Sequence, residues 1–266
     1  MIILIPMAGA GSRFSKEGYK KHKPVIPTKD HRTGLSVPMV VAATSDLPNA
    51  DNKDTKIIYI DRDFHKKDGV EQQIKEYFPQ AEFITINYLT EGQASTCLLA
   101  KDNINNNEEL IIAGCDNGMI IDSSKFEELR KDADALIFTY RGHNLVLEKP
   151  EAHGWVCVDN IDNVTGMSVK KPISDTPLND HAVVATFWFK KGSSFVEACE
   201  KMVEENDRIN SEFYVDQVMK HMLDLNYKVK VFEVEKYICW GTPKDYEEYE
   251  NTFDYWNNFC QKEEHL

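Results

Sequence analysis

Short apolar runs alternate with helical patterns through the first half of the chain. Continuous Ile and Leu runs are typical of parallel strands that are covered on both faces. They predict four buried strands, at Met1–Met7, Lys56–Ile60, Glu82–Ile86 and Leu110–Gly114. Between these runs, apolar residues at helical spacing predict crossover helices at Gly69–Phe78 and Gln93–Ile104. The β-α-β alternation indicates a parallel sheet in a Rossmann-like α/β fold.

The second half of the chain has a different pattern. β-branched and aromatic runs between turn residues predict antiparallel or mixed strands that extend the sheet, at Trp155–Val158, Val164–Val169 and Ala182–Phe189. Further helices and a strand are predicted at Ser194–Glu205, Phe213–Leu225 and Lys228–Val234, followed by a terminal helix from Pro243. No repeat or linker interrupts the pattern. We therefore expect one α/β domain over residues 1–266, with a mixed, mainly parallel sheet flanked by helices and an elaborated C-terminal half.

Composition and charge narrow the class of protein. The 266 residues are 42% hydrophobic and 11% aromatic, which is typical of a globular chain. The 31 Lys and Arg residues face 44 Asp and Glu residues, a formal net charge of −13. This acidity argues against nucleic acid or an anionic membrane surface as the main partner. A few well-placed cations nevertheless suffice to bind a small phosphate compound.

No segment predicts a membrane span, a signal peptide or a metal knuckle. Apolar runs stay well short of the roughly 18–20 residues that a span needs, and no cationic segment precedes the apolar N-terminus. The cysteines are scattered and form no Cys-x-x-Cys pair; they are Cys97, Cys115, Cys157, Cys199, Cys239 and Cys260. We expect buried, reduced thiols in a cytoplasmic protein.

The segment after the first predicted strand is rich in small residues and ends in cations. Pro6–Phe14 reads Pro-Met-Ala-Gly-Ala-Gly-Ser-Arg-Phe, and Lys23 follows shortly before a Val-Ile-Pro run. Small residues let a ligand approach the backbone, whose N–H groups bind anions. Phe14 stands where a dinucleotide-binding fingerprint needs a third glycine. The Gly-Lys-Ser/Thr sequence that closes a P-loop is also absent. Arg13 and Lys23 suit a polyphosphate, although the glycines alone are equally compatible with a tight turn and a surface arginine.

This loop and the Lys-x-Lys-Pro-Val-Ile-Pro that follows resemble the signature of the sugar-phosphate nucleotidyltransferases, also called nucleotide-sugar pyrophosphorylases. The resemblance implies a fold of the nucleotide-diphospho-sugar transferase type. It implies that the loop wraps a nucleoside triphosphate, with nucleotide-binding roles for Ala8, Gly9, Ala10, Gly11 and Ser12. Arg13 and Lys23 become catalytic residues that contact the triphosphate.

Two further motifs match the family near the ends of predicted strands. Thr90–Ala94 lies at a strand-to-helix transition where the family holds the nucleobase, so the resemblance gives base-binding roles to Gly92 and Gln93. A Gln side chain offers both a donor and an acceptor to a base edge. Asp116 follows the fourth predicted strand, where an aspartate faces the ligand crevice. The resemblance makes Asp116 a catalytic Mg²⁺ ligand, a role that suits a hard oxygen donor; a helix cap is the alternative.

The acceptor side departs from the family pattern. Lys171 matches the lysine that contacts the acceptor phosphate, whereas Lys170 replaces the usual sugar-binding glutamate. Glu212 opens a predicted helix and is a candidate acceptor-binding residue, unless it only complements the helix dipole. Cys239 stands where the family often places a second metal-binding aspartate. No second metal ligand is therefore assigned, and we interpret Cys239 as a packing residue.

These motifs predict an Mg²⁺-dependent nucleotidyltransferase. It would move a nucleoside monophosphate from a nucleoside triphosphate to a sugar 1-phosphate or similar small phosphorylated acceptor and release pyrophosphate. The family suggests a role in making capsule or cell-surface polysaccharide precursors. Two alternatives stay open: a glycosyltransferase of the related nucleotide-sugar fold, and a non-catalytic nucleotide-binding regulator. The sequence assigns no base and no oligomeric state, and gives no role to the insertion at Lys29–Val37.

Overall fold

The computed structural model describes the backbone of residues 1–263 and the side chains of residues 1–257. The strands are β1 Ile2–Pro6, β2 Pro27–Lys29, β3 Ser36–Pro38, β4 Lys56–Arg62, β5 Glu82–Ile86, β6 Leu110–Ala113, β7 Asn117–Ile120, β8 Ala135–Tyr140, β9 Gly154–Val158, β10 Val164–Val169, β11 His181–Phe189, β12 Val229–Glu233 and β13 Lys236–Cys239. The α-helices are α1 Ser12–Lys16, α2 Met39–Ser45, α3 Asp63–Lys67, α4 Val70–Lys75, α5 Gln93–Leu98, α6 Lys101–Ile104, α7 Ser123–Leu129, α8 Leu145–Glu148, α9 Gly192–Glu204, α10 Val215–Asp224 and α11 Pro243–Glu263. Short 3₁₀ helices are η1 Lys23–Val25, η2 Pro150–Ala152 and η3 Pro177–Asn179.

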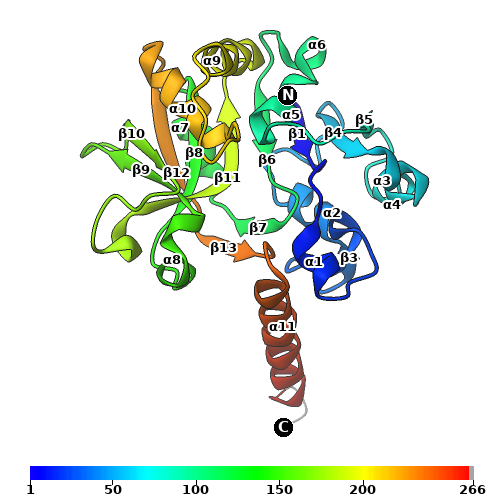
Figure 1. The fold of residues 1–266 in the computed structure, drawn as a ribbon. Coiled ribbons are helices and arrows are strands. Elements are labelled where there is room, and N and C mark those ends of the chain that lie inside the picture. The colour runs from blue at the N-terminus through cyan, green and yellow to red at the C-terminus, as the bar shows by residue number, and fades with distance from the viewer. Residues whose placement is uncertain (264–266) are drawn as a thin grey trace.

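A nine-stranded mixed sheet runs through both halves of the chain (Figure 1). Its main path is β10-β9-β11-β6-β1-β4-β5, and β8 pairs with β11 and β12. The N-terminal strands β6, β1, β4 and β5 are parallel, whereas β11 is antiparallel to β6, β8 and β9. The predicted α/β sheet, with its parallel first half and its mixed extension, is confirmed; within the extension, β12 pairs parallel with β8.

Helices cover both faces of the sheet, because alternate residues of each strand point to opposite sides. Ile3 and Ile5 of β1 pack in the apolar cluster that includes α2, α4 and α7. Ile2 and Leu4 pack in the opposite cluster with α5, α9 and α10. Each large apolar side chain removed from water contributes about 1.5–3 kcal/mol to stability. Packing in these two clusters fixes the position of the strands whose carboxyl ends form the candidate site described below.

Strand β11 joins the two halves through a bulge. Its register against β8 shifts between Val183 and Phe187, and Ala185 in this interval has a φ of 61°. The N–H group of Gly114, just after β6, donates to the carbonyl of Ala185 at 3.1 Å. A bulge bends its strand locally, and this one lies at the carboxyl end of β6, beside the site.

One predicted helix is corrected by the structure. Gln93–Ile104 is two helices, α5 and α6, separated at Leu99 and Ala100. The N–H groups of both residues bond three residues back, to Thr96 and Cys97, and such tight bonds commonly end a helix. The sequence interpretation also missed the short pairs β2–β3 and β7–β13, helix α2, and β8, whose six residues are all buried.

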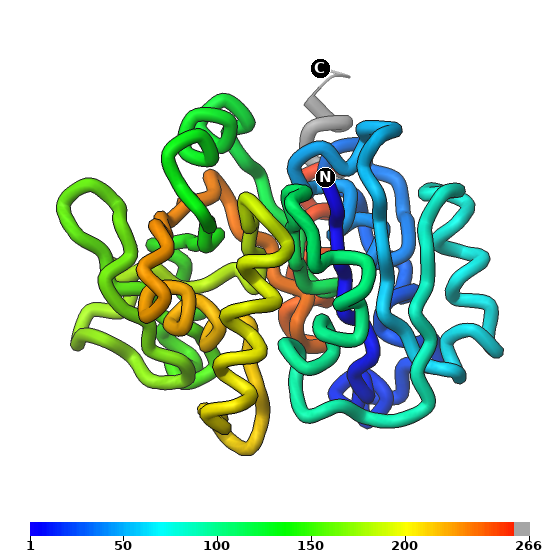
Figure 2. The backbone as a smooth tube through the Cα atoms, turned by 90° about the horizontal axis from the view of Figure 1, so that it is seen from above, coloured from blue at the N-terminus to red at the C-terminus, as the bar shows by residue number. Residues whose placement is uncertain are grey.

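The Lys29–Val37 insertion forms the turn of the β2–β3 hairpin and contacts α11. The backbone N–H of Lys29 donates to Glu250 at 2.7 Å, and its carbonyl accepts from the Tyr249 hydroxyl at 2.7 Å. Lys29 Nζ also pairs with Asp254 at 2.8 Å. Figure 2 shows the two halves side by side, with the C-terminal segment (red) returning to the N-terminal half. The hairpin therefore holds the terminal helix against that half.

The predicted thiols are free, but they are not all buried. Cys97 and Cys199 are buried, whereas Cys115, Cys157 and Cys239 are partly exposed. Cys260 lies outside the side chains that the structure describes. Among the described residues, no helix combines the length and apolar character that a membrane crossing requires.

Candidate active site

Two adjoining cavities open beside the carboxyl ends of β1 and β6. The loop pocket, of about 520 Å³, is lined by residues 9–15, 19–24, Phe64 and His65 among others. The cleft, of about 1230 Å³, is lined from both halves of the sheet and by the first turns of α11. Arg13, Gln93 and Asp116 line both cavities. Three residues predicted from separate motifs therefore form the boundary between the cavities.

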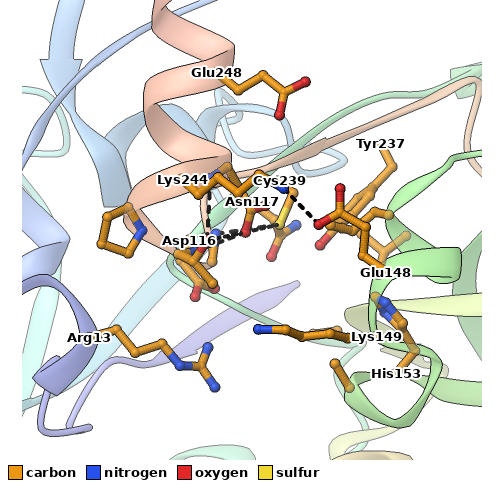
Figure 3. Close-up of a pocket in the computed structure, with 18 of the residues that line it drawn as sticks. Arg13, Asp116, Asn117, Glu148, Lys149, His153, Tyr237, Cys239, Lys244 and Glu248 are labelled. Carbon is orange, nitrogen blue, oxygen red and sulfur yellow. Dashed lines mark hydrogen bonds and ion pairs between the residues drawn. The ribbon is translucent and has the colours of Figure 1, made fainter.

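The predicted nucleotide loop forms one wall of the loop pocket. Gly9, Ala10, Gly11 and Ser12 line it, whereas Ala8 is buried and does not. A methyl group added to Gly9 would meet no atom within 4 Å, so this position faces open space. Arg13 is exposed and forms no hydrogen bond or ion pair with any residue that the structure describes; it points into the cleft in Figure 3. Its guanidinium is free to bind an anion.

Lys23 and Asp116 contact each other at the boundary between the cavities. Lys23 Nζ donates to Asp116 Oδ2 at 2.6 Å and to the carbonyl of Gly241 at 2.9 Å. The ammonium also lies 5.0 Å from the ring centroid of Phe14, a distance that permits a cation–π interaction. An ammonium has three donors, and two of them bond to residues that the structure describes. One N–H of Lys23 is left for a ligand oxygen.

Cys239 lies on the β7–β13 ribbon beside this pair. It pairs in register with Asn117, and the next residue, Trp240, donates its N–H to the Asp116 carbonyl at 3.0 Å. Burial, with a contribution from the nearby Asp245 carboxylate, raises the pKa of the Cys239 thiol to about 12. The thiol is therefore protonated at neutral pH. A protonated thiol is a poor nucleophile and a poor ligand for a hard cation.

Gly92 has a packing role that the sequence did not reveal. Its φ is 125°, and a Cβ there would lie 2.5 Å from the carbonyl oxygen of Phe213. The backbone of Phe213 also forms hydrogen bonds to residues on both sides of this turn. Its carbonyl accepts from the Ala94 N–H at 3.0 Å, and its N–H donates to the Glu91 carbonyl at 2.8 Å. The close backbone of Phe213 explains the glycine. That Gly92 also binds a nucleobase stays a prediction, while Gln93 does line both cavities.

The two predicted acceptor residues lie outside the residues that line the cleft. Lys171 and Glu212 are both exposed, and their sequence neighbours Lys170 and Asp216 line the cleft instead. Lys170 has a left-handed backbone with a φ of 63°, and its ammonium donates to the carbonyl of Ala152 at 2.6 Å. Both predicted segments lie beside the cleft, although the two predicted side chains do not line it. The side-chain directions had to come from the structure.

Two cleft residues had no sequence signal. Lys149, between α8 and η2, extends toward Arg13 across the cleft (Figure 3). His153, before β9, has a buried Nε2 for which the described residues provide no hydrogen-bond partner, while its Nδ1 lies 3.3 Å from the Tyr140 hydroxyl. Burial lowers the pKa of His153, which favours the neutral ring. Both residues lie in the cleft because of the course that the backbone takes after β8.

The sequence of this chain matches no family model and no curated protein. Solved structures are similar over nearly the whole chain. The nucleoside-diphosphate-sugar pyrophosphorylase from Vibrio cholerae RC9 has a TM-score of 0.76 at 18% identity, covering 94% of this chain and 99% of that one. The inositol-1-phosphate CTP transferase from T. maritima has a TM-score of 0.68 at 12% identity, with 94% and 93% covered.

A UDP-glucose pyrophosphorylase solved with UDP-glucose is also similar. Its TM-score is 0.70 at 15% identity, with 95% of this chain and 97% of that chain covered. Likeness at such identities shows a common fold. The predicted nucleotide-diphospho-sugar transferase type of fold, which the neighbouring nucleotide-sugar pyrophosphorylases share, is thus confirmed.

Proposed function

We propose that this chain is a nucleotidyltransferase. It transfers a nucleoside monophosphate from a nucleoside triphosphate to the phosphate of a small acceptor, such as a sugar 1-phosphate, and releases pyrophosphate. The main support is the contact between Lys23 and Asp116 at the boundary between the loop pocket and the cleft. Each cavity can hold one of the two substrates. The Lys23 ammonium and the Asp116 carboxylate lie where the two substrates would meet. The fold shared with pyrophosphorylases supports the same reaction class.

The loop pocket is assigned to the nucleoside triphosphate. Gln93 offers an amide to the base, and the free N–H of Lys23 donates to a phosphate oxygen. Arg13 faces the cleft without a partner among the described residues, so its guanidinium is available to the leaving pyrophosphate. Preorganised cations of this kind supply most of the catalysis in phosphoryl-type transfer.

The reaction is a single displacement. An oxygen of the acceptor phosphate forms a bond to the α-phosphorus, and the bond from that phosphorus to the bridging oxygen of the pyrophosphate breaks. The second pKa of a phosphate monoester is about 6, so the attacking oxygen is largely ionised at neutral pH. The mechanism therefore needs no general base, and the protein acts by positioning and charge.

Asp116 fits a Mg²⁺ ion that reaches the site with the triphosphate. Mg²⁺ commonly binds through one or two carboxylates together with substrate phosphates and water. No cluster of three metal-ligating side chains occurs among the described residues, and the neighbouring Cys239 thiol does not suit a hard cation. Asp116 would thus be the protein ligand. When bound, the ion neutralises charge on the triphosphate.

Two further proposals concern the cellular setting. Free thiols at the five described cysteines agree with a cytoplasmic enzyme. Synthesis of a precursor for capsule or cell-surface polysaccharide is supported by the sequence resemblance alone, and fold similarity does not choose a substrate.

A pyrophosphate-release screen tests the proposed function. Each common nucleoside triphosphate is combined with a panel of phosphate monoesters and Mg²⁺, and Asp116→Ala serves as the inactive reference. We expect one pair of substrates to release pyrophosphate in proportion to the activated product. Transfer of sugar from a sugar nucleotide would instead indicate a glycosyltransferase. Nucleotide binding without turnover of any pair would indicate a regulator.

A further inference from the structure

The β7–β13 ribbon carries Asp116 and the carbonyl that anchors Lys23. Asp116 directly precedes β7, and Gly241, whose carbonyl accepts from the lysine, follows shortly after β13. The ribbon is a two-stranded sheet separate from the nine-stranded sheet, and in Figure 1 it lies between that sheet and the start of α11. A two-stranded ribbon is at best marginally stable by itself. The geometry of the candidate site therefore depends on contacts that hold the ribbon from outside.

One such contact comes from Asp46, the residue that caps the C-terminal end of α2. Its carboxylate is 1% exposed, and Oδ2 accepts a hydrogen bond from the N–H of Met119 in β7 at 2.9 Å. A Cβ on Gly118 would lie 2.8 Å from this oxygen and 2.9 Å from the Trp240 ring. The ribbon therefore fits between the carboxylate and the indole because residue 118 has no side chain.

The Asp46 carboxylate needs compensation at this place. The C-terminal end of a helix carries partial negative charge, and a buried carboxylate is costly unless donors surround it. The Lys29–Val37 insertion supplies these donors. His31 Nε2 lies 3.0 Å from Asp46 Oδ1, and Arg32 Nε lies 3.5 Å from the same oxygen. The carboxylate thus faces the ribbon with one oxygen and the insertion with the other.

Arg32 holds the insertion in this position. Its Nε and Nη2 donate to the two carboxylate oxygens of Asp30, at 2.9 and 2.7 Å. Its Nη1 donates to the carbonyl of Ser45, at the end of α2, at 2.7 Å. The guanidinium therefore joins the insertion to α2. Because His31 directly precedes this anchored residue, its ring is presented to the buried carboxylate by a fixed backbone.

A second route leads from the insertion back to the ribbon through α11. The Trp240 and Tyr249 rings pack with 5.5 Å between their centroids, and the Tyr249 hydroxyl donates to the carbonyl of Lys29 at 2.7 Å. Trp240 also donates its N–H to the Asp116 carbonyl. Insertion, buried carboxylate, ribbon and terminal helix form a closed circuit of contacts. Packing and hydrogen bonds of this kind, outside the reacting groups, keep a site in its productive geometry.

We propose that Asp46 and His31 are positioning residues for the Lys23–Asp116 pair. Neither is among the residues that line the loop pocket or the cleft, so they act through the ribbon and not on a substrate. The proposal rests on the proposed function. It also gives the insertion a role, because the insertion holds the carboxylate that fixes the ribbon. A displacement of about 1 Å at reacting groups can cost about 10²-fold in rate.

Kinetics with the active substrate pair test this role. We expect Asp46→Asn and His31→Ala to lower kcat by about tenfold or more, with both KM values within about threefold of the wild type. A glutamine amide can donate to the carboxylate in place of the imidazole, so His31→Gln should recover most of the lost rate. His31 is partly exposed, so its variants give an answer even if Asp46→Asn does not fold.

Thr44→Val is the matched control for general destabilisation. Thr44 is buried two residues before Asp46, and its hydroxyl contacts the Val40 carbonyl at 2.7 Å and the Tyr59 hydroxyl at 3.1 Å. Both contacts lie away from the ribbon. Urea unfolding compares the stabilities of the variants, and kcat of Thr44→Val should stay within about twofold of the wild type. Equal losses of kcat in Thr44→Val and Asp46→Asn, or no recovery in His31→Gln, would overturn the proposal.

The side-chain ammonium of Lys23 gives a readout that needs no substrate. Its ¹⁵Nζ signal in proton–nitrogen NMR at low temperature, assigned by its loss in Lys23→Arg, reports the two hydrogen bonds that hold it. We expect a sharp signal in the wild type and Thr44→Val, and a broadened one in Asp46→Asn and His31→Ala. An unchanged signal in both of these variants would overturn the inference. If the signal changes as expected but no substrate pair releases pyrophosphate, the positioning role stands and the proposed function fails.

Discussion

Lys23 and Asp116 lie 93 positions apart in the sequence, and their side chains meet at 2.6 Å. The lysine comes from the segment after the glycine loop, and the aspartate from the turn between β6 and β7. The contact joins the two motifs that the sequence marked independently. It also orients the lysine before any substrate binds, since Gly241 fixes a second donor of the same ammonium.

Removing either member of this pair should abolish most of the activity. We expect Lys23→Ala and Asp116→Ala each to lower kcat/KM for pyrophosphate release by about 10²-fold or more, the scale of losing a charge-stabilising group. Because the two residues act as a unit, the double variant should lose little more than either single variant. Asp224→Asn is the control. Full activity in both single variants would refute the site assignment.

Gly92→Ala should lower the stability of the protein. A Cβ at 2.5 Å from the Phe213 carbonyl, combined with a φ of 125°, forces the turn to move. The expected loss is about 2–4 kcal/mol, within the range for strained or overpacked positions. Chemical denaturation followed by circular dichroism measures it.

Gly9→Ala is the matched comparison for Gly92→Ala. A methyl group there meets no atom within 4 Å, so the stability should stay close to that of the wild type. The same methyl group projects into the loop pocket and should weaken nucleoside triphosphate binding, which calorimetric titration measures. Equal destabilisation by both substitutions would contradict the packing role of Gly92.

Asp61→Asn should stabilise the protein at neutral pH. Asp61 is fully buried, and neither carboxylate oxygen has a partner with good hydrogen-bond geometry among the described residues. Burial raises its pKa to about 6; the Thr85 hydroxyl acts against this rise, and the nearby Glu71 adds a smaller increase. A carboxyl with a raised folded-state pKa favours folding when protonated, and this contribution is lost as the pH rises from about 4 to about 6.

The gain from Asp61→Asn should therefore grow across this pH interval. It should reach about 1–3 kcal/mol at pH 7.5, given roughly 1.4 kcal/mol per pKa unit. Urea unfolding at several pH values measures the difference, with the exposed Asp54→Asn as control. A gain that does not depend on pH would show that ionisation of Asp61 is not its cause.

Local motifs marked residues that the structure brings together on the loop side of the candidate site. Arg13, Gln93 and Asp116 each follow a strand that the apolar pattern revealed, and parallel strands bring their carboxyl ends to one edge. The side of the cleft opposite Arg13 was less accessible to sequence reasoning. Lys149 and His153 enter through the path of the chain after β8, and no local pattern marks them.

Two features of the fold explain why the second half was harder to predict. Ala135–Tyr140 is a continuous buried run, and its apolar character was a signal that the sequence interpretation passed over. The bulge at Ala185 has no such signal. Its residue with a φ of 61° is an alanine, so no glycine marks the bulge in the sequence. That bulge decides which part of β11 lies beside β6, and only tertiary packing specifies it.

The anchor of Lys23 at Gly241 also sets an order of events during synthesis. The two residues are 218 positions apart, so at about 5–20 residues per second the lysine leaves the ribosome roughly 10–40 s before its anchor exists. Trp240, which binds the backbone of Asp116, arrives at the same late stage. A nascent chain therefore carries the glycine loop and the aspartate without a finished site. The candidate site is complete only after β13 and the start of α11 have been synthesised.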